Sequence, residues 1–327
     1  MNEFAAHRLL IRGTVERTLE LNEHKGSALR GTLYHSLRNR FCTMRDAVDD
    51  CTTCPLWQVC PVCELVNTLA PDNRLGRDAS RPYTVQPPLD GGKTRYEPGE
   101  SIVFGLTLYG DVVRYFPYLA MALTAMEESG IGRRVADNDW QRGTFRIEDI
   151  WAENPLTGTR QRLAQAGDAT VHMPETPITH EQVLAQADQL AKKPALTLDL
   201  LTPTRLTYRG RLVKPGRVTF DVFMARLFDR LESLAQHYCA TPLKLDYGAL
   251  LEQTAHVHTV ADKTQWVELR SYSTRQQRAT PIGGLIGRLT FVADDWTPYA
   301  PWLVWGQFTH IGKDTVKGNG WYRLRAG

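Results

Sequence analysis

Residues 306–322 read GQFTHIGKDTVKGNGWY, and this is the stretch from which the fold and the ligand of the chain can best be approached. Residues 312–320 contain three glycines and two lysines, bracketed by His310 and by an aromatic pair, Trp321 and Tyr322. Glycine adopts positive φ and lets backbone N–H groups come close to a ligand. Successive N–H groups beside lysine make a concave, positive bed for phosphate. The loop lacks the GKS or GKT ending of a nucleotide P-loop. We therefore predict a glycine-rich loop that grips a polyanion and leads into a final strand.

Upstream of this loop, the second half of the chain alternates between strand-like and helix-like segments. A set of apolar residues at helical spacing predicts an amphipathic helix that ends near residue 238. Its members are Phe220, Phe223, Leu227, Leu231 and Leu234. The other predicted elements are a strand and hairpin over 196–213, a short helix over 246–255, and strands over 266–270, 285–292 and 321–325.

The first half of the chain shows the same alternation. Leu29, Leu33 and Leu37 fall on one helical stripe that Phe41 continues, and Ser27 is the predicted N-cap. The other predicted elements are strands over 7–18, 101–109 and 143–152, and a helix over 112–128 that keeps its proline in the first turns.

This repeated order predicts an α+β chain made of two tandem ferredoxin-like domains. We place the domains at 1–165 and 190–327, and we expect the polar residues 155–193 to form an irregular junction. The first domain would carry a cysteine-rich insertion at 42–63, and the second the glycine-rich loop at 312–320.

The composition is that of an ordinary globular chain, with 42% hydrophobic and 23% charged residues, which excludes a largely disordered protein. No apolar run is long enough to cross a bilayer, and the first residues lack the order of a signal peptide. We therefore expect a cytoplasmic protein without a membrane partner. The net charge is only +3, and the basic excess lies in the second half, so total charge alone does not identify a nucleic-acid-binding protein.

Five cysteines crowd into residues 42–63: Cys42, Cys51, Cys54, Cys60 and Cys63. Two CxxC pairs can close a tetrahedral Zn²⁺ site, although the five-residue gap between the pairs is short for a zinc ribbon. Cys42 offers a rival set with Cys51, Cys54 and Cys60. A closed four-thiolate site has no open position, so the pattern predicts structural zinc. Free thiols and an iron–sulfur cluster are the alternatives.

His35 lies nearly opposite the leucine stripe of the first predicted helix. It shares its face with Gly31, which leaves space one turn earlier, and with Arg38. A histidine beside an open space and an arginine suits a general acid or base near phosphate. The alternative is an ordinary surface histidine.

Five segments, in their order along the chain, resemble segments of the CRISPR-associated endoribonucleases of the RAMP superfamily, which cut precursor CRISPR RNA at its repeats. They are LRGTLYHSLR at 29–38, the insertion with CPL at 54–56 and CP at 60–61, LTPTRL at 201–206, SYSTRQ at 271–276 with PIGGLIG at 281–287, and the loop at 310–320. Each segment alone is weakly specific, whereas the ordered set is specific.

The resemblance implies RNA bound across two RRM-like domains and cleavage without a catalytic metal, which yields a 2′,3′-cyclic phosphate and a 5′-hydroxyl. It implies that His35 is catalytic, because a histidine on or near the first helix often is in this family. It also implies the ligand set that ends at Cys60, with Cys63 as an alternative ligand. The residues that we expect to contact RNA are Arg30, Arg38, Arg275, Gln276, His310, Lys313 and Lys317.

The expected partners are CRISPR repeat RNA, as precursor and as mature guide, and subunits of a CRISPR effector complex. A guide-RNA-binding subunit that does not cleave is the main alternative. A zinc-ribbon DNA-binding regulator is less favoured, because residues 64–80 offer little basic helix beside the cysteines.

Overall fold

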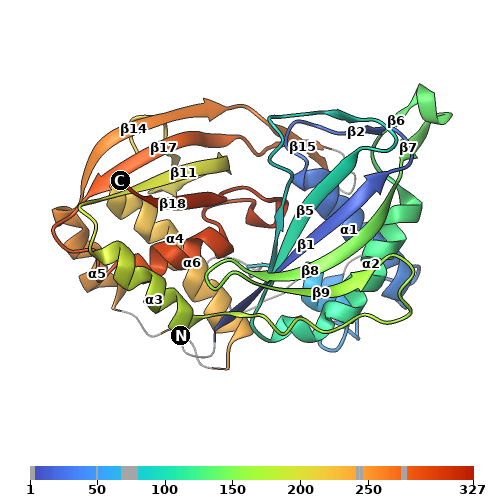
Figure 1. Ribbon diagram of the computed structural model, residues 1–327, viewed down its shortest axis with the longest axis horizontal. Helices are drawn as coiled ribbons and strands as arrows, with labels where there is room; N and C mark the ends of the chain where they lie inside the picture. Colours follow the sequence, from blue (N-terminus) through green and yellow to red (C-terminus); the bar gives the residue numbers. More distant parts are fainter. Residues whose placement is uncertain (1–3, 49–50, 68–79, 241–242, 244–245, 274–277) are drawn as a thin grey trace. The chain divides into compact units, whose positions relative to one another are not determined.

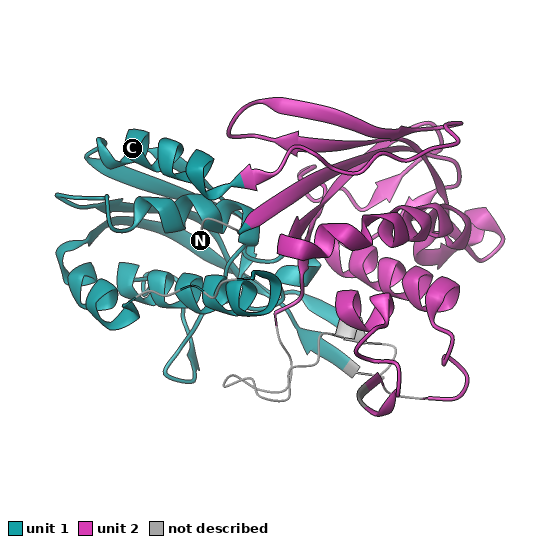
Figure 2. Cartoon of the chain, turned by 90° about the horizontal axis from the view of Figure 1, so that it is seen from below, with its two compact units in different colours: residues 1–4, 179–327 teal, residues 5–178 magenta. Residues whose placement is uncertain are grey.

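Alternating burial along β1 (Ala5–Val15) shows how the first sheet forms: Leu9 and Ile11 are buried, whereas Arg12 on the opposite face is exposed. The computed structural model describes residues 4–48, 51–67, 80–240, 243, 246–273 and 278–327. It divides into two compact units. The N-terminal unit comprises residues 5–178, and the C-terminal unit comprises residues 179–327 with Phe4; Figure 2 colours them magenta and teal.

The sheet of the N-terminal unit has the order β3-β5-β1-β8-β9, and its paired neighbours are antiparallel. Its other strands are β3 (Tyr83–Gln86), β5 (Ser101–Tyr109), β8 (Phe145–Asn154) and β9 (Thr159–Gln165). Helices α1 (Gly26–Phe41) and α2 (Phe116–Ser129) pack against each other (Figure 1). Without β9, the succession of strands and helices is the βαββαβ order of a ferredoxin-like domain.

The C-terminal unit repeats this arrangement with a four-stranded sheet in the order β14-β17-β11-β18. Its elements are α3 (His180–Ala191), β11 (Ala195–Thr204), α4 (Phe220–Tyr238), α5 (Tyr247–Gln253), β14 (His258–Val267), β17 (Gly284–Val292), α6 (Ala300–Thr309) and β18 (Tyr322–Ala326). Figure 1 shows α4 and α6 together on one side of this sheet. The two predicted ferredoxin-like folds are thus confirmed.

The two units also contain shorter elements. They are β2 (Leu19–Glu20), β4 (Arg95–Tyr96), β6 (Ile131–Val135), β7 (Gln141–Gly143), β10 (Ile178–Thr179), β12 (Thr207–Tyr208), β13 (Arg211–Leu212), β15 (Arg270–Ser273), β16 (Arg278–Pro281), and the turns of helix η1 (Cys51–Thr53), η2 (Cys63–Asn67), η3 (Gly110–Tyr115), η4 (Ala136–Asn138), η5 (Thr254–His256) and η6 (Thr315–Lys317). No helix in the described ranges combines the length and apolar character that a bilayer crossing requires.

The leucine stripe of α1 is buried as predicted. The N-cap of the helix, however, differs from the prediction. Lys25, rather than Ser27, precedes the first turn, and no side chain caps it. The Lys25 side chain is fully buried, where its Nζ donates to Asp90 at 2.8 Å and lies over the Tyr96 ring. A tertiary ion pair therefore sets this helix end.

The division between the two units, after residue 178, lies within the segment 155–193, but this segment is not irregular as we predicted. It contains β9 and then α3, which begins with a capping box between Thr179 and Gln182. Leu163 on β9 and Val183, Ala187 and Leu190 on α3 are buried. These scattered apolar residues hold the segment in regular structure despite its polar composition.

Candidate active site

The outer face of α1 carries the residues that the sequence singled out. The burial of the leucine stripe turns His35 outward, where it is exposed. Gly31 lies one turn before it, and a Cβ built there meets no atom within 4 Å. The predicted open space beside the histidine is thus present on this helix face.

The positive charges of three arginines affect the pKa of the His35 imidazole. Partial shielding of the ring from water, followed by the charges of Arg142, Arg30 and Arg38, lowers the pKa of His35 from its usual 6.5. A lowered pKa means that the ring is predominantly neutral at neutral pH, with a free nitrogen lone pair. The chemistry that this arrangement supports is proton abstraction next to an anion held by guanidinium groups.

Tyr34 contacts the histidine from the neighbouring position on the helix. The Tyr34 and His35 rings meet edge to face, with their centroids 5.2 Å apart. The Arg30 guanidinium lies 5.2 Å from the centroid of the Tyr34 ring. Tyr34 therefore links Arg30 to the histidine and restricts the orientation of both side chains.

Arg142 was not among the residues that we predicted for the site. It lies on β7, more than a hundred residues beyond His35, and no local motif marks it. The hairpin of β6 and β7 packs closely on the backbone around β2. A Cβ at Gly143 would overlap the carbonyl oxygen of Thr18, and one at Gly132 would overlap that of Glu20. Only glycine allows the hairpin to lie this close.

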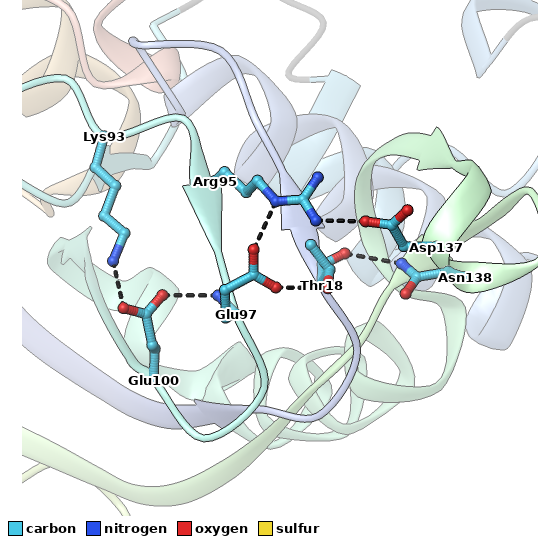
Figure 3. Close-up of polar contacts among 7 residues, drawn as sticks. All are labelled: Thr18, Lys93, Arg95, Glu97, Glu100, Asp137 and Asn138. Atoms are coloured by element: carbon cyan, nitrogen blue, oxygen red, sulfur yellow. Dashed lines mark hydrogen bonds and ion pairs between the residues drawn. The ribbon is translucent and has the colours of Figure 1, made fainter.

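A polar network fixes the same hairpin at its tip (Figure 3). Asn138 donates from its side-chain amide to the backbone oxygen of Thr18 at 2.8 Å. The Thr18 hydroxyl donates to Glu97 at 3.0 Å. Arg95 donates to Glu97 at 2.6 Å and also pairs with Asp137. These contacts tie η4 to β4, so the strand that bears Arg142 is held from two sides.

The glycine-rich loop of the C-terminal unit directs many of its backbone N–H groups inward. The amide of Ile311 donates to Gly320, that of Gly320 to Pro203, and that of Lys313 to Arg205. The amides of Lys317 and Gly318 also donate to carbonyl oxygens within the loop. Most of the phosphate bed that we predicted from backbone amides is therefore occupied by the protein itself.

His310 stabilises this loop from inside. Its side chain is fully buried, its Nδ1 lies 3.2 Å from the backbone oxygen of Asn319, and its ring stacks on Trp321 with 5.9 Å between centroids. A buried ring does not face a ligand, so the RNA contact predicted for His310 is not retained.

Two lysines remain as the cationic side chains of the loop. Lys313 is exposed, whereas Lys317 is half-buried and its Nζ lies 2.9 Å from Asp314. Arg275 and Gln276 lie outside the described residues. The surface of this loop is consequently less cationic than its sequence suggested.

The cysteine insertion brings the thiol of Cys63 into hydrogen bonds with those of Cys51 and Cys60, and these bonds together with burial raise the pKa of Cys63. Cys54 is buried as well, whereas Cys42 is the residue that ends α1. All of these cysteines are free. Within the described ranges, no group of three or more His, Cys, Asp and Glu side chains already has the geometry of a metal site.

Two models of known protein families match this chain. Residues 4–176, more than half of the chain, match the family model AF_1859_N, described as an N-terminal domain. Residues 198–322 match the model of the CRISPR-associated endoribonuclease Cas6. The chain belongs to the Cas6-type family of CRISPR-associated RAMP proteins. A search among curated proteins gave no match.

Solved Cas6 structures share the fold. Thermus thermophilus Cas6 (TTHB231) superposes with a TM-score of 0.55 at 13% identity, over 98% of this chain and 99% of that one. A Cas6 (TTHA0078) product complex gives 0.52 at 16% identity, over 98% and 99%. A partial Cas6-RT-Cas1–Cas2 complex gives 0.62 at 12% identity over 99% of this chain, which spans only 46% of that longer chain. At such identities the likeness to these Cas6 chains establishes the fold alone.

Proposed function

We propose that this chain cleaves precursor CRISPR RNA within its repeats and that His35 is the general base. The observation that carries the proposal is the exposed imidazole beside open space on α1, with three arginines acting on it. The match of residues 198–322 to an endoribonuclease family supports the same reaction class.

In the proposed step, neutral His35 accepts the proton of a ribose 2′-hydroxyl. The oxygen attacks the adjacent phosphorus, the bond from phosphorus to the 5′ oxygen breaks, and that oxygen takes a proton from a water molecule, which regains one from protonated His35. The products are a 2′,3′-cyclic phosphate and a 5′-hydroxyl, and the step consumes no water. One positioned proton carrier typically contributes a factor of about 10²–10⁴.

Arg30, Arg38 and Arg142 are the proposed donors to the phosphorane, whose negative charge exceeds that of the ground-state phosphodiester. The charges that lower the pKa of His35 would thus also stabilise the transition state. Lys313 and Lys317 are proposed to contact the RNA backbone through their side chains. Repeat RNA, its cleaved guide and effector subunits remain the proposed partners, in a cytoplasmic setting.

The decisive experiment incubates end-labelled repeat RNA with the protein in EDTA. We expect cleavage at one position and a 3′ end that resists phosphatase until acid opens the cyclic phosphate. RNA that is bound but stays intact would instead identify a guide-binding subunit. Cleavage that EDTA abolishes while the protein keeps its fold and its zinc content would contradict the metal-independent mechanism.

We also propose that the cysteine insertion binds structural zinc through Cys51, Cys54, Cys60 and Cys63. Contact between the thiols of Cys51, Cys60 and Cys63 supports this set over the one with Cys42. Leu56 and Val59 are exposed, so the insertion has little core of its own and would gain stability from a metal.

Metal analysis of the purified protein tests the zinc site. We expect one zinc per chain in the wild type and in Cys42→Ser and Cys239→Ser, and loss of zinc in Cys63→Ser. Retention in Cys63→Ser together with loss in Cys42→Ser would refute this ligand set.

A further inference from the structure

Trp140, at the tip of the β6–β7 hairpin, has an unfavourable backbone conformation. Its φ is +59°, in the left-handed region that bulky residues rarely adopt. Its side chain is 69% exposed, so burial of the indole offers little compensation. The preceding residue, Asp139, has φ +53°, but aspartate tolerates this region far better. The turn therefore carries a residue that folding alone does not favour.

A second unfavourable feature lies two residues away. Arg142 on β7 is directly opposite Arg134 on β6, and like charges in this position destabilise a hairpin. Both side chains are exposed. Neither guanidinium forms an ion pair with any residue in the part of the chain that the structure describes.

The neighbouring Arg133 shows what an ordinary structural arginine does on this hairpin. Its guanidinium donates to Asn22 at 2.9 Å and lies 3.6 Å from Glu20. Arg133 is thus paired with the residues around β2, whereas Arg134 and Arg142 are left available. Violations of local rules that cluster in this way typically mark a functional site.

The position of the hairpin connects these features to His35. Arg142 acts on the His35 ring, and the network in Figure 3 holds η4, immediately before the tip. An exposed indole beside two unpaired guanidinium groups matches one ligand chemistry in particular. A single-stranded nucleic acid offers a base face for stacking and a phosphate for the arginines.

We propose that the β6–β7 hairpin is an RNA-binding site in which Trp140 stacks on an unpaired base and Arg134 and Arg142 hold a phosphate next to it. This inference deepens the proposed function, since the phosphate would lie near His35. The backbone strain at Trp140 is retained because the indole must stand at the tip of the turn.

Trp140→Gly separates this role from a structural one. Glycine adopts positive φ without strain, so we expect the melting temperature to rise by about 2 °C. We expect the affinity for repeat RNA to fall about 5- to 100-fold, the usual range for one lost stacking contact. Affinity is measured in a His35→Ala background, so that the RNA stays intact.

Asp139→Gly is the matched control in the same turn. It also relieves strain at positive φ, and it removes a negative charge while keeping the indole. We expect its melting temperature to rise and its RNA affinity to be equal to or tighter than that of the parent. A series of repeat RNAs with single abasic sites should contain one RNA for which Trp140→Gly no longer weakens binding.

Unchanged RNA affinity in Trp140→Gly would overturn the inference. If RNA affinity were unchanged and the variant lost self-association, the hairpin would be a contact between protein molecules. A lowered melting temperature would show that Trp140 serves folding. If the wild type binds RNA without cutting it and Trp140→Gly still weakens binding, the proposed cleavage activity is refuted and the proposed RNA-binding site is kept. If the wild type cuts RNA and Trp140→Gly binds normally, this site alone fails.

Discussion

In each ferredoxin-like unit a helix follows the central strand, α1 after β1 and α4 after β11, but the two units use this helix differently. In the C-terminal unit, α4 buries Phe223, Leu227, Leu231 and Leu234, and even Arg230 is buried and donates to the backbone oxygen of Thr309. In the N-terminal unit, α1 buries only a narrow stripe and leaves its other face to polar residues. One copy of the fold thus serves as a packed support, and the other keeps a helix face free for chemistry.

Glycines show the same contrast. In the C-terminal unit, a Cβ at Gly320 would overlap the carbonyl oxygen of Ile311, so this glycine is required by packing. In the N-terminal unit, Gly31 has no neighbour that a Cβ would meet. A glycine in the middle of a helix with space around it is unfavourable for folding and has no packing reason to be there.

The largest effect is expected from the histidines of these two helices. His35→Ala should slow single-turnover cleavage of repeat RNA by a factor of about 10²–10⁴ and leave RNA affinity nearly unchanged. His237→Ala, near the end of α4, is the matched control and should cut normally, because the Nδ1 of His237 lies 2.7 Å from the backbone oxygen of Ser233 within its own helix. Equal rates for both variants would remove the functional distinction between the helices.

The second largest effect concerns the stability of the C-terminal unit. Gly320→Ala combines a positive φ of 72° with backbone overlap, so we expect a loss of about 3 kcal/mol or more in the free energy of unfolding. Denaturant titration measures this loss. A variant as stable as the wild type would show that the loop can rearrange and that its glycine is not fixed by packing.

Gly31→Ala should behave in the opposite way. Alanine in a helix interior is favoured over glycine by roughly 0.5–1 kcal/mol, so the protein should become slightly more stable. The same methyl group would occupy the space beside His35, and kcat/KM for repeat RNA should fall. An unchanged kcat/KM would mean that the substrate does not use this space.

The smallest effect is a shift in the pH dependence of cleavage. Because the pKa of His35 lies below its usual value, the base is available at neutral pH and is lost only as the pH falls through the lowered pKa. Arg142→Gln removes one cause of that shift, so the acidic limb of log kcat/KM should move to higher pH. A limb that stays in place would show that Arg142 does not act on the base.

Local patterns predicted the elements that local physics controls. The stripe of Leu29, Leu33 and Leu37 and the exposure of His35 follow from helical periodicity, and both are found. Pro117 lies in the first turn of α2, the place in a helix that tolerates proline. The ferredoxin-like order followed in turn from the alternation of such elements.

Tertiary contacts account for what the sequence did not reveal. Lys25 begins α1 because Asp90 pairs with it, and His310 is buried because the glycine loop folds over it. The charge of Arg142 affects His35 because two glycines allow the β6–β7 hairpin to pack closely against β2. None of these contacts has a signature within a few residues, so pattern and spacing could not identify them.

The junction of α3 and α6 also supplies an optical reporter. Within the C-terminal unit, the indole of Trp305 donates to Nδ1 of His180 at 3.0 Å, and the two rings are nearly parallel, 11° apart. Burial lowers the pKa of His180, so this imidazole takes up its proton only at a lower pH than an ordinary histidine does. A protonated imidazole quenches indole emission, and acidification should therefore dim Trp305 and reveal how this half of the molecule responds without any added dye.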